Sequence, residues 1–258
     1  MKIVTYQSQE IFRLGVVVQD RVIDLEKLCK SYQTENGTSL LVDLPEDMLA
    51  LMRSNDITWK FIGEIVNWAE RKPESLKPYF SPLGKVKLAA PIVNPSKIIC
   101  VGLNYHDHCR EQNVEVPKRP LLFAKFPSTI IGHEEDITWQ PHTTNQVDYE
   151  ADLDVVIGSR GRNIPLDESY SYIAGYTIVN DVSARDLQFS DGQWVRGKSL
   201  DTFCPMGPYL VTADEVPDPQ NLKIQCWVNG ELRQDSNSAE MVFKIPELIH
   251  FISQTCTL

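Results

Sequence analysis

The apolar and polar positions predict strands near the start of the chain and helices after them. Residues 2–6 and 13–25 are rich in β-branched side chains, which favours short strands, and Gln19-Asp20 interrupts the second run as a turn. Residues 44–54 and 57–71 carry apolar side chains at helical spacing and are predicted as helices. Residues 72–84, rich in Pro, Ser and Lys, are predicted as a connector.

A period-two pattern occupies residues 146–158, QVDYEADLDVVIG. Asp148, Glu150, Asp152 and Asp154 alternate with apolar residues, so a strand here directs all four carboxylates to one face. A row of like charges on one face repels itself unless a positive charge lies nearby. Two interpretations stay open, a solvated sheet face and a divalent-metal site.

Further strands and helices follow the same logic. Residues 176–179 form a predicted buried strand that ends at Asn180 and Asp181, where Asp181 is either a turn residue or a third carboxylate beside Glu150 and Asp152. The remaining predictions are a strand over 97–101, a strand and turn over 120–129, a short helix over 167–172, a hairpin over 222–233 with an Asn229-Gly230 turn, and a helix over 245–255.

Residues 104–113 predict a short helix or lid with a possible acid–base pair. His108 and Glu111 are three positions apart and share a helix face, where a carboxylate can orient an imidazole as a general base. The alternative is a surface pair without function. Lys125 stands alone between apolar residues, so its charge reaches either the solvent or a cleft.

Composition narrows the functional classes. The net charge is −10 over 258 residues, without a basic block, which argues against nucleic acid or an anionic membrane as a partner. The start of the chain lacks an apolar leader-like segment and no run is long enough to span a membrane, so a cytoplasmic location is expected. Six scattered cysteines without a C-x-x-C pair predict reduced thiols.

Four motifs in order resemble the fumarylacetoacetate hydrolase family, closest to its domain-containing proteins. They are Gly102-x-Asn104-Tyr105-x-x-His108-x-x-Glu111, Tyr149-Glu150-x-Asp152, Asn180-Asp181-Val182-Ser183-x-Arg185-Asp186 and Gly197-Lys198-x-x-Asp201-Thr202-Phe203-x-Pro205-x-Gly207-Pro208. The resemblance implies an α+β fold: a small N-terminal α+β domain (1–85) and a mixed β-roll catalytic domain (86–258). It also implies a homodimer.

The resemblance further implies the residues of an active site. Glu150, Asp152 and Asp181 match the ligands of a divalent metal, Mg²⁺ or Mn²⁺ with Ca²⁺ as an alternative, which agrees with their hard oxygen chemistry. His108, Glu111 and Lys198 match the catalytic residues of the family. Arg185 and Gln188 match positions near the substrate, and Lys125, as a lone cation that could reach a cleft, is the third substrate-binding candidate.

This site predicts chemistry on a small anionic 2-oxo acid. One reaction is hydrolysis of a C–C bond in an acylpyruvate-like 2-oxo acid or 1,3-dicarbonyl compound, through an enolate that the metal stabilises. Decarboxylation or keto–enol tautomerisation of oxaloacetate uses the same groups, so these alternatives stay open. An alternative of a different class is a catalytically inactive, truncated family member that only dimerises or binds metal.

Two departures from the family pattern bear on activity. Asp152 stands where members usually have Glu, which withdraws the ligand by about one bond length and matters for a cation as demanding as Mg²⁺. Members also continue past residue 258 with a Tyr-Pro-Gly-Asp and a Thr-Gly-Thr-Pro-containing stretch. The resemblance therefore implies that the C-terminal part of the family domain is missing here.

Overall fold

One antiparallel sheet of seven strands runs through the computed structural model, which describes residues 1–37, 43–72 and 75–258. Its order is β4-β3-β2-β1-β13-β10-β9. The strands are β1 (Lys2–Ser8), β2 (Ile11–Val18), β3 (Arg21–Asp24), β4 (Phe80–Pro82), β9 (Ala151–Ile157), β10 (Ile173–Asn180) and β13 (Leu210–Thr212).

Smaller pairs of strands surround this sheet. They are β5 (Ile98–Gly102) with β6 (Leu121–Lys125), β7 (Ile130–Ile131) with β12 (Cys204–Pro205), β8 (Val147–Asp148) with β11 (Ser183–Ala184), and β14 (Lys223–Val228) with β15 (Glu231–Asn237). Only the β7–β12 pair is parallel among the strands of the described residues. The predicted α+β class with mixed strand pairing is confirmed.

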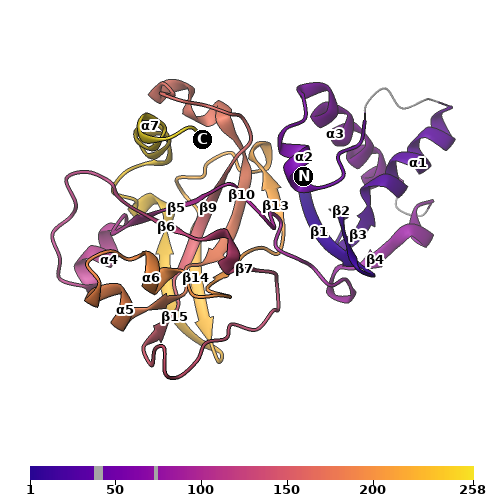
Figure 1. Ribbon diagram of the computed structural model, residues 1–258. Helices are drawn as coiled ribbons and strands as arrows, with labels where there is room; N and C mark the ends of the chain where they lie inside the picture. Colours follow the sequence, from indigo (N-terminus) through magenta and orange to yellow (C-terminus); the bar gives the residue numbers. More distant parts are fainter. Residues whose placement is uncertain (38–42, 73–74) are drawn as a thin grey trace.

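The helices form two groups in Figure 1, one in the lobe of the N-terminal strands and one in the other lobe. The α-helices are α1 (Leu25–Asn36), α2 (Met48–Met52), α3 (Asp56–Arg71), α4 (His106–Glu111), α5 (Arg185–Ser190), α6 (Val195–Lys198) and α7 (Ile245–Thr255). The 3-10 turns are η1 (Lys77–Tyr79), η2 (Leu83–Lys85), η3 (Pro127–Thr129), η4 (Leu166–Tyr172), η5 (Ala213–Glu215) and η6 (Ser238–Glu240). No helix among the described residues is both long and apolar enough to cross a membrane.

The sheet joins the N-terminal strands to the rest of the chain. Strand β1 pairs with β13, with Lys2 opposite Val211, and Figure 1 shows these strands meeting where the two lobes touch. The largest core cluster likewise contains Leu28 and Ile65 from the N-terminal helices together with Val179 and Leu210. The division at residue 85 stays a prediction, although the sheet and core continue across it.

Several local predictions are confirmed and two are corrected. The Gln19-Asp20 turn has both residues at positive φ, as the hairpin turn requires. The predicted strand over 13–25 runs too far, because Asp24 caps helix α1. The predicted connector contributes the edge strand β4, while its residues 73–74 lie outside the described part of the chain. All six cysteines are free, as expected.

Asp24 is a buried cap whose charge depends on hydrogen bonds from three partner residues. It is 5% exposed and accepts from the Lys27 amide at 2.9 Å, Arg13 Nε at 2.6 Å and the Tyr6 hydroxyl at 2.7 Å. Burial opposes ionisation, but these hydrogen bonds, led by Arg13, outweigh burial and lower the pKa of Asp24. The ionised carboxylate is therefore favoured in the folded state.

This shift sets the sign of a pH effect. The stabilisation of the folded state by ionised Asp24 is fully present above the pKa that an Asp has in the unfolded chain. It is lost as pH falls through the lower pKa of Asp24 in the folded protein. We expect Asp24→Asn to lower the free energy of unfolding by about 1–3 kcal/mol near neutral pH, with the difference shrinking below about pH 4. Urea unfolding at several pH values measures it, with Asp47→Asn, at the exposed cap of α2, as control. An equal difference at every pH would contradict the prediction.

Candidate metal centre and active-site cavity

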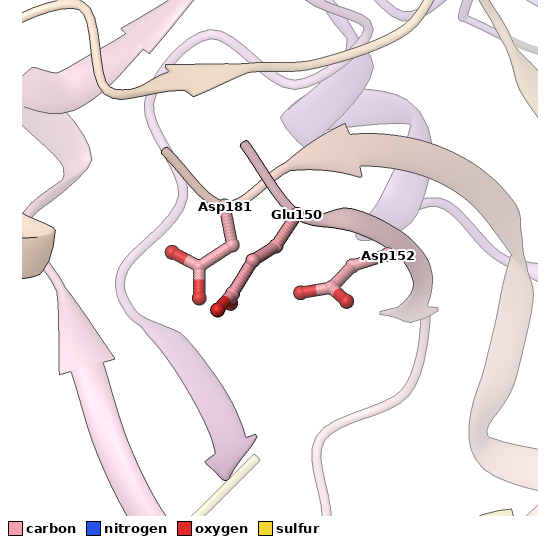
Figure 2. A group of neighbouring side chains, drawn as sticks. All are labelled: Glu150, Asp152 and Asp181. Carbon is pink, nitrogen blue, oxygen red and sulfur yellow. The ribbon is translucent and has the colours of Figure 1, made fainter. Parts of the chain in front are cut away.

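Three carboxylates converge where β9 begins and β10 ends. The backbone fixes two of them side by side, because the Glu150 amide donates to Asn180 Oδ1 at 3.0 Å and the Asp181 amide donates to the Glu150 carbonyl at 2.8 Å. One oxygen from each of Glu150, Asp152 and Asp181 lies within 4.8 Å of the others. Figure 2 shows the three side chains directed into the same space from these two segments.

The prediction of one continuous strand for the acidic stretch is wrong, because the strand is interrupted at Tyr149-Glu150. The chain leaves the sheet at Tyr149-Glu150, and β8 pairs with β11 instead. As a result, Asp148 accepts hydrogen bonds from Arg185 and does not join the carboxylate trio. Asp154 stays on β9 opposite Thr177, and burial raises its pKa to about 6.

Lys198 and Arg185 neutralise part of this negative charge. Lys198 is 1% exposed, and its Nζ lies 2.6 Å from Glu150 Oε2 and 2.7 Å from Asp181 Oδ2. Arg185 Nη2 lies 2.6 Å from Glu150 Oε1, and its Nη1 donates to Gln188 at 2.9 Å. Burial opposes the charge of Lys198, but Asp181 and Glu150 outweigh it and raise the lysine's pKa. Lys198 is therefore an ammonium in this structure.

Lys125 contacts Asp181 from behind the site. Its Nζ lies 2.7 Å from Asp181 Oδ1, and it also donates to the carbonyls of Val182 and Lys198. These acceptors occupy the three N–H groups of the ammonium. The side chain is 2% exposed and is not part of the cavity wall, so here it orients Asp181. Burial opposes ionisation of Asp181, but Lys125 and Lys198 lower its pKa.

Asp152 differs from the other two carboxylates in having no ion pair among the described residues. Burial, then the charges of Asp181 and Glu150, raise its pKa well above the usual range. Three carboxylates that meet at one point supply the hard oxygen ligands that Mg²⁺, Mn²⁺ and Ca²⁺ prefer. The residues present therefore fit a divalent cation, with Glu150, Asp152 and Asp181 as the groups that would hold it.

A cavity of about 570 Å³ opens over the carboxylates. Its walls come from α4, α5, α6 and the β14–β15 hairpin, and they include eight of the nine predicted site residues: His108, Glu111, Glu150, Asp152, Asp181, Arg185, Gln188 and Lys198. Lys125 is the ninth. The sequence motifs thus meet at one cavity, although the segments that carry them are far apart along the chain.

Helix α4 closes one side of the cavity and is tied to the segment after β15. Asn104 Nδ2 donates to the Phe243 carbonyl at 3.1 Å, and the Phe243 amide returns a hydrogen bond to Asn104 Oδ1 at 2.9 Å. His108 Nδ1 lies 4.0 Å from Glu111 Oε2, beyond a direct hydrogen bond. The helix is present as predicted, and the catalytic pairing of His108 with Glu111 stays a prediction.

Sequence reasoning assigned no role to several cavity residues. The Phe123 ring lies 5.0 Å from Lys198 Nζ, and the Tyr105 hydroxyl is buried without a hydrogen-bond partner in the described part of the chain. Trp194 and Arg233 also line the cavity. The Asn229-Gly230 turn predicted the hairpin that carries Arg233, but no local signal predicts that the hairpin lies over residues 149–152.

Gly197 lets α5 and α6 approach closely beside Lys198. A Cβ there would lie 2.7 Å from Gln188 Cα and 2.8 Å from the Ala184 carbonyl oxygen, both rigid backbone atoms. We expect Gly197→Ala to lower the free energy of unfolding by about 1–3 kcal/mol, because these backbone atoms must move to make room for the Cβ. Thermal unfolding measures this effect. Gly63→Ala, where a Cβ meets nothing within 4 Å, is the control, and equal effects of both substitutions would contradict the prediction.

Comparison with known proteins agrees with this geometry. The family described as Fumarylacetoacetate (FAA) hydrolase C-terminal matches residues 97–258. The chain belongs to the fumarylacetoacetate hydrolase family. The oxaloacetate tautomerase YisK of Bacillus subtilis (strain 168) is 39% identical over 262 residues, covering 100% of this chain and 85% of the relative.

Two further proteins show the range of the similarity. The mitochondrial oxaloacetate tautomerase Fahd2a of Rattus norvegicus is 52% identical over 178 residues, covering 69% of this chain and 56% of the rat protein. The chain thus spans little more than half the length of that relative. The crystal structure of maleylpyruvate hydrolase from Sphingobium sp. SYK-6 with manganese(II) and pyruvate has a TM-score of 0.71 at 28% identity, covering 100% of this chain and 84% of that one. The predicted fumarylacetoacetate hydrolase type of fold is confirmed.

Proposed function

We propose that this protein catalyses the keto–enol tautomerisation of oxaloacetate or of a closely related small 2-oxo acid. The convergence of Glu150, Asp152 and Asp181 beside the ammonium of Lys198, inside a cavity, carries the proposal. The oxaloacetate tautomerases of Bacillus subtilis and Rattus norvegicus, at 39% and 52% identity, support the choice of reaction.

The cavity residues suit a proton transfer between carbon and oxygen. In this reaction one proton leaves the carbon next to the keto group and one arrives on the keto oxygen. A bound Mg²⁺ or Mn²⁺ would supply positive charge that polarises the keto group. Lys198 donates a hydrogen bond toward the oxygen on which negative charge develops, and His108 on the cavity wall accepts or returns the proton.

Hydrolysis of acylpyruvate-like 2-oxo acids is the second candidate. His108 and Glu111 both line the cavity, where a histidine oriented by a carboxylate would activate water. The maleylpyruvate hydrolase of Sphingobium sp. SYK-6 gives this reaction a structural precedent at 28% identity. We rank hydrolysis second because the named tautomerases are more similar in sequence to this chain. In addition, His108 Nδ1 and Glu111 Oε2 lie 4.0 Å apart, beyond a direct hydrogen bond.

An assay that separates three reactions tests the proposal. Oxaloacetate enol is followed by ultraviolet absorbance, pyruvate from decarboxylation by a coupled dehydrogenase, and acetylpyruvate cleavage by acetate release. We expect Mn²⁺-dependent tautomerisation, without pyruvate above the spontaneous rate, and its loss in Glu150→Gln. Glu168→Gln, an exposed change on η4, should keep the wild-type rate.

Other outcomes of this assay would replace the proposal. Faster cleavage of acetylpyruvate than tautomerisation would favour the hydrolase, and faster pyruvate release would favour a decarboxylase. Mn²⁺ binding by calorimetry without any turnover would favour a family member that binds metal and catalyses nothing. A homodimer accompanies the proposal as an expectation from the family resemblance, and light scattering in solution tests the dimer.

A further inference from the structure

Three Lys or Arg side chains line the cavity, and they differ in depth. Lys198 is buried, and the side chain of Arg185 is 19% exposed. The side chain of Arg233, on β15, is 48% exposed and lies at the rim. The cavity therefore has a deep cationic end near the carboxylates and a separate cation near its mouth.

The two deep cations are already engaged by protein groups. Arg185 Nε and Nη2 contact Asp148, Nη2 also contacts Glu150, and Nη1 donates to Gln188. Lys198 contacts Glu150 and Asp181. A substrate that reaches the deep end meets cations whose charge is shared with these carboxylates.

Arg233 is held in place with part of its guanidinium free. Its Nε donates to the Tyr149 hydroxyl at 3.0 Å and its Nη1 lies 3.1 Å from Glu231 Oε1. Its Nη2 donates to no group among the residues that the structure describes. The unpaired Nη2 of this planar, charged group can donate a charge-assisted hydrogen bond to a carboxylate.

Arg233 is also tied closely to the carboxylate centre. Its anchor, Tyr149, directly precedes Glu150 in the chain. The next residue, Gln234, accepts a hydrogen bond at 2.9 Å from the Ala151 amide, which lies between Glu150 and Asp152. The hairpin is thus fastened over residues 149–151, so the rim cation and the carboxylate centre keep a fixed relation.

We propose that Arg233 is a specificity-determining residue that binds the second carboxylate of a dicarboxylic 2-oxo acid. The inference rests on the proposed function and adds the substrate class. The 2-oxo acid end of the substrate lies at the carboxylate centre, and the carboxylate at the other end reaches the free Nη2 of Arg233. A 2-oxo acid with a methyl ketone in place of that second carboxylate gains nothing from Arg233.

Two ligands that differ only at this end provide the test. Oxaloacetate carries a carboxylate where acetylpyruvate carries an acetyl group, and oxalate is a reference that tests the carboxylate centre alone. Binding to the Mn²⁺-loaded protein is measured by tryptophan fluorescence and calorimetry, so the readout does not require turnover. The variants are Arg233→Gln and, as the control, Arg110→Gln, whose arginine pairs with Glu240 and is not part of the cavity wall.

We expect Arg233→Gln to weaken oxaloacetate binding by roughly tenfold, as for a charge-assisted hydrogen bond at a half-exposed site. Acetylpyruvate and oxalate should change by less than about twofold, within the range of a surface substitution. Arg233→Lys should recover part of the loss because it keeps the charge. Arg110→Gln should change none of the three.

Two results would overturn the assignment. If Arg233→Gln weakened the binding of oxaloacetate and acetylpyruvate equally, Arg233 would only hold the hairpin in place. If neither ligand bound more weakly, or if the wild type did not bind oxaloacetate, Arg233 would have no role in substrate recognition. Failure of the proposed function looks different. The wild-type protein would then bind oxaloacetate more tightly than Arg233→Gln does, yet tautomerise nothing.

Discussion

Replacing Asp181 by asparagine is expected to abolish Mn²⁺ binding and to destabilise the fold. The carboxylate is 1% exposed and lies between the ammonium groups of Lys125 and Lys198, at 2.7 Å from each. Removing its charge leaves Lys125 buried with only carbonyl acceptors. Breaking a buried ion pair by removing one partner costs about 3–5 kcal/mol. Urea unfolding and calorimetric titration with Mn²⁺ measure the two effects.

Two matched variants separate the causes. Lys125→Met removes the rear cation and keeps all three carboxylates, so we expect a loss of stability with Mn²⁺ binding retained. Asp191→Asn makes the same chemical change at an ion pair with Arg196 on the protein surface, and should leave both properties near wild type. Unchanged stability in Asp181→Asn would show that the buried lysine does not need this partner.

Replacing Lys198 by methionine is expected to remove activity without removing the metal centre. The ammonium contacts Glu150 and Asp181, two of the three carboxylates that would hold a cation. Loss of a positioned donor to the reacting oxygen lowers kcat by roughly 10²–10³. Loss of a neighbouring positive charge leaves the carboxylates more attractive to Mn²⁺, so its dissociation constant should stay the same or fall.

The two readouts are an oxaloacetate tautomerisation assay at saturating Mn²⁺ and a calorimetric titration. Lys97→Met, an exposed lysine before β5, is the matched control and should be unchanged in both. Activity and Mn²⁺ affinity that fall together would mean that Lys198 builds the centre and does not act on substrate. Wild-type activity in Lys198→Met would remove the residue from the mechanism.

Local structure was predictable where the signal is local. The Asn229-Gly230 turn specifies its hairpin because both residues adopt positive φ, and helix α7 begins and ends where its apolar spacing predicted. Helix α1 was missed because the β-branched run before it continues to Asp24. The cap was the available signal, since Asp24 accepts from the Lys27 amide.

The site was only partly predictable, because its decisive contacts join distant segments. The alternating sequence pattern alone predicted that Asp148 lies beside Glu150, Asp152 and Asp181. In the structure the chain leaves the strand at Tyr149, and Asp148 accepts a hydrogen bond from Arg185. The family resemblance selected Glu150, Asp152 and Asp181, and the structure brings their oxygens together. Which cation faces which carboxylate, and the position of Arg233 at the rim, depend on tertiary packing that no short motif encodes.

The pairing of β1 with β13 has a consequence during synthesis on the ribosome. Strand β1 emerges well before β13, because Thr212, whose amide donates to the Met1 carbonyl, lies 211 positions later in the chain. Until then β1 pairs with β2 and, at Tyr6, with Leu88, while the backbone groups at Lys2 and Ile3 that β13 later pairs stay open and attract other strands. The nascent chain must therefore keep this part of β1 from aggregating until translation has delivered its neighbour.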